Sequence, residues 1–143
     1  MKNLIVNRID KSLPLPDYQT KGAVAFDLYS REDKTIKPGE IALLPTNLIV
    51  KIPSGYFLMI ASRSSLPIKK RLMLVNGVGI IDQDYCGPED EIKIQMMNIS
   101  KKKVKIEKGE RIAQALLVKI ARPNLIEKKI RAKSRGGFGS TGR

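Results

Sequence analysis

The sequence predicts an all-β domain, folded as a β-sandwich or jelly roll. Helical periodicity is almost absent from the 143 residues, and short stretches alternate apolar with polar side chains instead. In residues 91–96, for example, Ile92, Ile94 and Met96 alternate with polar residues. Pro, Gly, Asn and Ser residues separate such stretches as turns. About ten short strands in a chain of this length are typical of a sandwich, and we expect antiparallel hairpins to make most of the connections.

The expected strands follow one another along most of the chain. They cover residues near 4–9, 40–45, 48–52, 56–60, 91–96, 103–107 and 111–119. The segment Ser62–Pro67 instead predicts a single helical turn with Ser62 as its N-cap. The last segment, Lys128–Arg143, carries six basic residues and no acid. It cannot pack a core by itself, so we expect it to be an arm outside the domain.

The composition indicates one soluble domain. The hydrophobic fraction is 42%, and no run approaches the roughly 18 consecutive apolar residues that a membrane span needs. We expect no secretory signal at the start of the chain, because the apolar run there is short and no cleavage pattern follows. Cys86 is the only cysteine, which excludes an intrachain disulfide. These features predict a cytoplasmic protein with no membrane partner.

The net charge of +13 favours anionic partners. Nucleic acid, acidic lipid and small polyphosphates all satisfy this condition. The seven Phe and Tyr residues are scattered along the chain, however, so no stacking platform for single-stranded nucleic acid is visible. Solubility is an equally good explanation of the lysine excess.

Residues 76–85 hold the densest group of candidate functional residues and predict a binding hairpin. Gly77 and Gly79 allow the backbone to turn and a ligand to approach closely. Asp82 follows at the mouth of the expected strand, and Asp84 should point to the opposite face because side chains alternate along a strand. The chain has no His, so a carboxylate is the expected base. The alternative is that both aspartates only cap backbone amides in the turn.

Two other segments offer groups suited to phosphate. Arg63, Ser64 and Ser65 supply a cation and two hydroxyls, although the same trio is common in surface loops. Asp27 lies in an apolar stretch and therefore needs a partner, which water, an arginine or the hydration shell of a metal would provide. Gln114 opens an apolar strand, where an ordinary strand entry is the alternative to a binding role.

Taken in order along the chain, these segments resemble the trimeric deoxyuridine triphosphate nucleotidohydrolases, or dUTPases. The matching segments are residues 22–28, 63–66, 76–85, 109–114 and 135–142. The resemblance implies a distorted jelly-roll subunit in a homotrimer, with each active site shared between neighbouring subunits. It also implies a body at residues 1–127 and a flexible C-terminal arm at residues 128–143 that closes over a neighbouring site.

The resemblance further implies that the protein hydrolyses dUTP to dUMP and pyrophosphate. Asp82 would orient a water for in-line attack on the α-phosphorus, and Asp27 would bind Mg²⁺ through water. Nucleic acid would not be required. The substrate-binding residues would be Arg63, Ser64, Ser65, Asn76, Ile80, Ile81, Tyr85, Gln114, Arg135, Gly137, Phe138, Ser140 and Thr141. Among them, Tyr85 would pack against the deoxyribose and Phe138 would stack on uracil.

Two other functions compete with this interpretation. A dCTP deaminase-related or bifunctional nucleotide enzyme would share the fold and the serine-rich loop. A basic nucleic-acid-binding module with an Arg-Gly-Gly tail would account for the charge. The resemblance also has a departure, because Pro88–Asp90 lengthens the connection after Tyr85 and leaves the position of Lys93 open.

Overall fold

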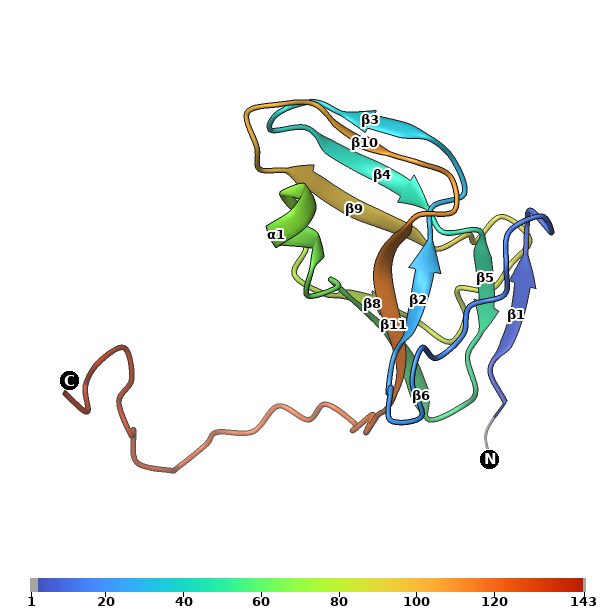
Figure 1. The fold of residues 1–143 in the computed structure, drawn as a ribbon. Coiled ribbons are helices and arrows are strands. Elements are labelled where there is room, and N and C mark those ends of the chain that lie inside the picture. Colours follow the sequence, from blue (N-terminus) through green and yellow to red (C-terminus); the bar gives the residue numbers. More distant parts are fainter. Residues whose placement is uncertain (1–2, 143) are drawn as a thin grey trace.

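The computed structural model describes residues 3–142, and its regular secondary structure consists of β-strands and one short helix (Figure 1). The strands are β1 (Ile5–Arg8), β2 (Phe26–Tyr29), β3 (Lys34–Ile36), β4 (Ile41–Pro45), β5 (Leu48–Lys51), β6 (Tyr56–Ala61), β7 (Leu72–Leu74), β8 (Gly79–Ile81), β9 (Lys93–Asn98), β10 (Val104–Ile106) and β11 (Arg111–Lys119). One short helix, α1 (Leu66–Lys70), lies between β6 and β7. The predicted all-β class is confirmed, and each expected strand is present.

The strands form two larger sheets and two strand pairs, all antiparallel. One sheet has the order β2-β11-β6-β8 and the other β4-β9-β7, while β1 pairs with β5 and β10 with β3. Within residues 3–142, no two paired strands are neighbours in the sequence. The expectation that hairpins make most of the connections is therefore wrong. The chain leaves one ladder and enters another at nearly every turn, as in jelly-roll folds.

The helix begins later than predicted. Ser65, rather than Ser62, is its N-cap residue, and its side chain makes no capping hydrogen bond. Pro67 explains the start, because a proline in the first turn lacks only an N–H that the helix does not need there. The Ser62 hydroxyl instead donates to the Arg63 carbonyl oxygen.

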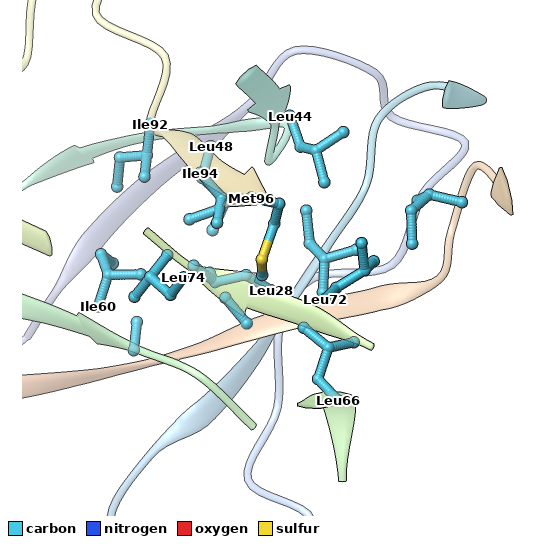
Figure 2. Packing of buried hydrophobic residues seen from close by; sticks show 14 of the residues in the cluster. Leu28, Leu44, Leu48, Ile60, Leu66, Leu72, Leu74, Ile92, Ile94 and Met96 are labelled. Atoms are coloured by element: carbon cyan, nitrogen blue, oxygen red, sulfur yellow. The ribbon is translucent and has the colours of Figure 1, made fainter. Parts of the chain in front are cut away.

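The core lies between the sheets and consists of aliphatic side chains (Figure 2). In β9, Ile94 and Met96 are buried, whereas Lys93 and Gln95, which alternate with them, are exposed, as the pattern predicts. Leu28 of β2 and Leu72 of β7 pack in the same cluster and are fully buried. This packing holds the two larger sheets at a fixed distance from each other.

The C-terminal segment leaves the body after β11. Residues 121–142 are exposed and contain no helix or strand, and Figure 1 shows them running away from the sheets. The predicted division at residues 127 and 128 stays a prediction, and residues 1–2 and 143 lie outside the described part. In that part, no helix has the length and apolar character needed to cross a membrane.

The segment predicted as a hairpin is a crossover between the two larger sheets. β7 pairs with β9 and β8 pairs with β6, so the two strands beside the turn are not partners. Gly77 takes a positive φ of 74° in this turn, and its N–H donates to the Leu74 carbonyl oxygen at 3.2 Å. Gly79 meets β6 so closely that a Cβ atom there would lie 2.9 Å from the Ile60 Cβ. Glycine at position 79 is therefore a condition for the pairing of β8 with β6.

We expect Gly79→Ala to lower stability by about 1–3 kcal/mol, because the added methyl group forces two paired strands apart. The measurement is the thermal midpoint at one fixed protein concentration. Gly22→Ala is the matched control, since nothing lies within 4 Å of a Cβ at that position. It should change stability by less than about 0.5 kcal/mol. A Gly79→Ala protein as stable as the parent would contradict the packing argument.

Candidate functional site

The first group of functional side chains is an arginine cluster, formed by Asp27, Arg63 and Arg111. Arg63 Nε donates to one oxygen of the Asp27 carboxylate at 2.9 Å, and Arg111 Nη1 donates to the other at 3.0 Å. Asp27 is only 7% exposed. Water, an arginine or a hydrated metal was expected to pair with this carboxylate, and in the fold two arginines do so.

Strand pairing brings these residues together from distant segments. Asp27 on β2 lies opposite Gln114 on β11, and Gln114 also lies opposite Ala61 at the end of β6. The Gln114 side-chain amide donates to the Ser62 carbonyl oxygen at 2.9 Å, which holds the loop that carries Arg63. Gln114 therefore has a positioning contact that its place in the sequence did not reveal.

The arginine cluster borders a cavity suited to an anion. Arg63, Arg111, Ser65 and Lys69 line this cavity of about 290 Å³ together with Lys70, whose ammonium is paired with Glu110. Two guanidinium groups share a single carboxylate here, so positive charge remains for a ligand. Sequence analysis missed Lys69 as a lining residue, and the basic run that follows Pro67 was the available signal. Ser64 is exposed beside the cavity.

The second group lies in the crossover pocket, a cavity of about 190 Å³ next to β8. Asn76, Ile80 and Ile81, all predicted from the sequence, line it. Lys93 and Gln95 also line the pocket. Sequence analysis left the position of Lys93 open and did not identify Gln95. Because β8 is an edge strand, one side of its backbone faces away from β6 and is available to a ligand.

Asp82 and Asp84 follow β8 and line one cavity of about 500 Å³. The strand expected here ends at Ile81 and a turn follows, so strand alternation does not set the directions of these two side chains. In this turn the Tyr85 N–H donates to the Asp82 carbonyl oxygen at 3.3 Å. The Gln83 side chain donates to the Tyr56 carbonyl oxygen at 2.9 Å and ties the turn to β6. Gln83 is thus a second positioning residue that sequence analysis missed.

The longer connection after Tyr85 is well ordered by hydrogen bonds. Its last residue, Glu91, is buried and forms a bidentate ion pair with Arg31, with Nε to Oε1 at 2.7 Å and Nη2 to Oε2 at 2.9 Å. This carboxylate raises the pKa of the Arg31 guanidinium above its ordinary value. The Tyr85 hydroxyl donates to the Glu91 carbonyl oxygen at 3.2 Å. The insertion therefore ends at a residue, Glu91, that is held by Arg31 and contacts Tyr85.

The arginine cluster and Asp82 lie at opposite ends of β6. Ile81 pairs with Leu58, and Asp82 shares its cavity with Tyr56 and Phe57. The β6 residues nearest the two groups, Phe57 and Ala61, are four positions apart, which at the rise of a strand corresponds to about 13 Å. Within one chain, the two groups therefore lie apart from each other along β6.

The tail residues predicted to bind substrate do not contact the body. Arg135, Gly137, Phe138, Ser140 and Thr141 are all exposed. A turn organises their segment, with the Ser140 N–H donating to the Gly137 carbonyl oxygen at 3.0 Å. Within residues 3–142, no group of three or more acidic or Cys side chains is placed to hold a metal ion.

Comparison with known proteins identifies the family. The model of the dUTPase family matches residues 11–142. The deoxyuridine 5'-triphosphate nucleotidohydrolase of Thermoanaerobacter sp. (strain X514) is 41% identical over 137 residues, which cover 92% of this chain and 90% of that protein. The protein of the same name from Helicobacter pylori (strain P12) is 37% identical over 140 residues, or 96% and 94% of the two chains.

Solved structures agree with the sequence comparison. The dUTPase from Streptococcus mutans superposes with a TM-score of 0.77 at 33% identity and covers 83% of this chain and 98% of its own. The dUTPase of Staphylococcus bacteriophage 80alpha, solved with dUPNHPP, superposes with a TM-score of 0.87 at 28% identity. That alignment covers 99% of both chains.

Proposed function

Given that this chain belongs to the dUTPase family and hydrolyses dUTP to dUMP and pyrophosphate, we propose that Asp82 is its general base. Asp82 borders the largest of the cavities described above and follows directly on the crossover pocket. The carboxylate would accept a proton from the water that attacks the α-phosphorus in line with the leaving pyrophosphate. This position at the end of β8, next to the crossover pocket, is the observation that carries the assignment.

Proton removal supplies only part of the rate in this proposal. An aspartate has an ordinary pKa near 3.9 and is a weak base at neutral pH. Alignment of the water with the phosphorus, and neutralisation of the phosphate charge by arginines, supply the larger share. In this proposal the arginine cluster, Ser64, Ser65 and Gln114 hold the triphosphate; its support is that Asp27 orients the two guanidinium groups.

The crossover pocket is proposed to recognise uracil. Asn76 and the outer backbone edge of β8 at Ile80 and Ile81 offer donors and acceptors to the edge of the base. A base in this pocket would cover these groups, and a ligand that leaves covered polar groups unpaired is rejected more strongly than one that differs only in size. Tyr85 then packs against the deoxyribose. In the tail, Phe138 stacks on the base while Arg135, Ser140, Thr141 and the Gly137 backbone reach the phosphates.

The residues present fit Mg²⁺ bound through water. Asp27 uses one lone pair of each oxygen for an arginine, which leaves acceptor capacity for water molecules. Mg²⁺ keeps several waters and takes most of its other ligands from substrate phosphates, so one carboxylate in its outer shell is sufficient. When bound, the ion would neutralise phosphate charge. Asp27 would orient its hydration shell from within the arginine cluster.

A homotrimer is proposed as the working form, with sites shared between chains. The separation of about 13 Å along β6 between the strand residues next to Asp82 and next to Arg63 supports a site in which different chains supply the two groups. The tail supports it as well, because Leu125, Ile126 and Ile130 are 96%, 72% and 85% exposed. Apolar side chains exposed in this way are typical of an interface. We place the enzyme in the cytoplasm, in keeping with its single cysteine.

Pyrophosphate release from dUTP, UTP, dTTP and dCTP, with and without Mg²⁺, tests this function. We expect Mg²⁺-dependent release from dUTP, with each of the other nucleotides at least about 100-fold slower. Ammonia release from dCTP would instead support the deaminase-related alternative. Absence of pyrophosphate from dUTP under all conditions would contradict the proposal.

Asp82→Asn should lower kcat about 10²- to 10⁴-fold, because it removes the general base while keeping the shape of the side chain. Binding of the non-cleavable analogue dUPNHPP, measured by calorimetry, should stay within about threefold of the parent because the base-binding and phosphate-binding groups are intact. Glu89→Gln is the control, since this exposed residue lies in the same connection. Near-parental turnover of Asp82→Asn would exclude the assignment.

Two inactive chains should restore activity when they assemble together. One carries Asp82→Asn, and the other ends at Ser134 and so lacks the residues that close the site. In equal co-expression we expect about a quarter of the parental activity, because half of the chains supply Asp82 and half supply an intact tail. A mixture no more active than the two chains alone would show that each site uses Asp82 and tail from one chain.

A further inference from the structure

The connection between Tyr85 and β9 brings the backbone of Glu91 to the Tyr85 hydroxyl. The Gly87 N–H donates to the Asp90 carboxylate at 2.7 Å, and the Asp90 N–H donates to the Gly87 carbonyl oxygen at 3.1 Å. These two bonds close the loop on itself. Glu91 follows, and its carbonyl oxygen accepts the Tyr85 hydroxyl at 3.2 Å.

Three donors hold the Glu91 side chain. Arg31 supplies two of them, at 2.7 and 2.9 Å, and the Asn47 N–H supplies the third at 2.9 Å. Both oxygens of this carboxylate are therefore engaged, and the residue is only 5% exposed. A bidentate guanidinium fixes orientation as well as distance. The position of the Glu91 backbone is set by residues far away in the sequence.

The partners of Glu91 are themselves anchored. The Arg31 N–H donates to the Pro45 carbonyl oxygen at 2.9 Å. Next to Glu91, the Ile92 N–H donates to the Leu48 carbonyl oxygen at 2.9 Å, and the Thr46 hydroxyl donates to the Ile92 carbonyl oxygen at 2.7 Å. The carbonyl group that receives the Tyr85 hydroxyl thus belongs to a rigid junction between β4, β5 and β9.

We infer that Arg31 and Glu91 are positioning residues that hold the Tyr85 ring in place and so set the preference for dUTP over UTP. This inference rests on the proposed function, in which Tyr85 packs against the deoxyribose. Tyr85 is 40% exposed, so surrounding side chains alone do not fix its ring. The hydroxyl bond to the anchored Glu91 carbonyl group supplies the missing constraint.

Rigidity matters because the two nucleotides differ by a single hydroxyl group. A pocket rejects an added hydroxyl only weakly when its wall can give way. A shift of about 1 Å in a group that contacts substrate is enough to change rates about 100-fold. Loosening the ring should therefore admit UTP while dUTP, which needs less space, remains a good substrate.

The test compares kcat/KM for dUTP and UTP in the parent, Arg31→Met, Tyr85→Phe and the double variant. We expect each single variant to lower the dUTP-to-UTP ratio about tenfold. The double variant should lower it no further than the stronger single variant, because both changes act through the same hydrogen bond. Arg71→Met, which alters an exposed arginine next to α1, should leave the ratio unchanged.

Thermal midpoints and oligomeric size identify the variants that are folded. Tyr85→Phe leaves the Arg31–Glu91 pair intact, so it remains informative if Arg31→Met does not fold. An unchanged ratio in folded Tyr85→Phe or in folded Arg31→Met would overturn the inference. The inference would also be overturned if Arg31→Met lowered the dUTP-to-UTP ratio equally in the parent and in the Tyr85→Phe background. A parent that does not cleave dUTP would instead remove the proposed function, which separates the two failures.

Discussion

Strand β6 is the element on which the candidate site depends, because it positions one group of functional residues at each end. Its pairing with β8 places the crossover pocket and Asp82, and its pairing with β11 places Gln114 beside the loop that carries Arg63. A strand is close to fully extended, so the two groups cannot approach each other. This separation is the feature of the single chain that supports the shared sites of the assembly we propose.

Two buried carboxylates, those of Asp27 and Glu91, hold the loops around the candidate site in place. Asp27 and Glu91 are each held by arginine from a distant segment, and within residues 3–142 no buried side-chain nitrogen or oxygen lacks a hydrogen-bond partner. Buried ion pairs add little net stability, because desolvation offsets much of their attraction. Their contribution here is geometric. One pair orients the groups proposed for phosphate, and the other fixes the junction beside Tyr85.

Local patterns located the strands well and the connections poorly. The alternation in residues 91–96 predicted β9 and its buried face, because every second side chain of a strand at the core must be apolar. The Asn-Gly turn at residues 76–77 predicted a hairpin, yet β7 and β8 belong to different sheets. Turn residues report that the chain bends, and they carry no information about which strand lies next to it afterwards.

The sequence by itself determined the all-β class, the candidate functional segments and, through the order of those segments, the family. Composition and spacing are local properties, and each of these conclusions needs nothing more. Only the tertiary structure decided that Asp27 meets both Arg63 and Arg111, that Asp82 and Asp84 line one cavity, and that Glu91 anchors Tyr85. The ion pairs of Asp27 and Glu91 with their arginines join segments far apart in the sequence, and they follow from long-range pairing that no local pattern encodes.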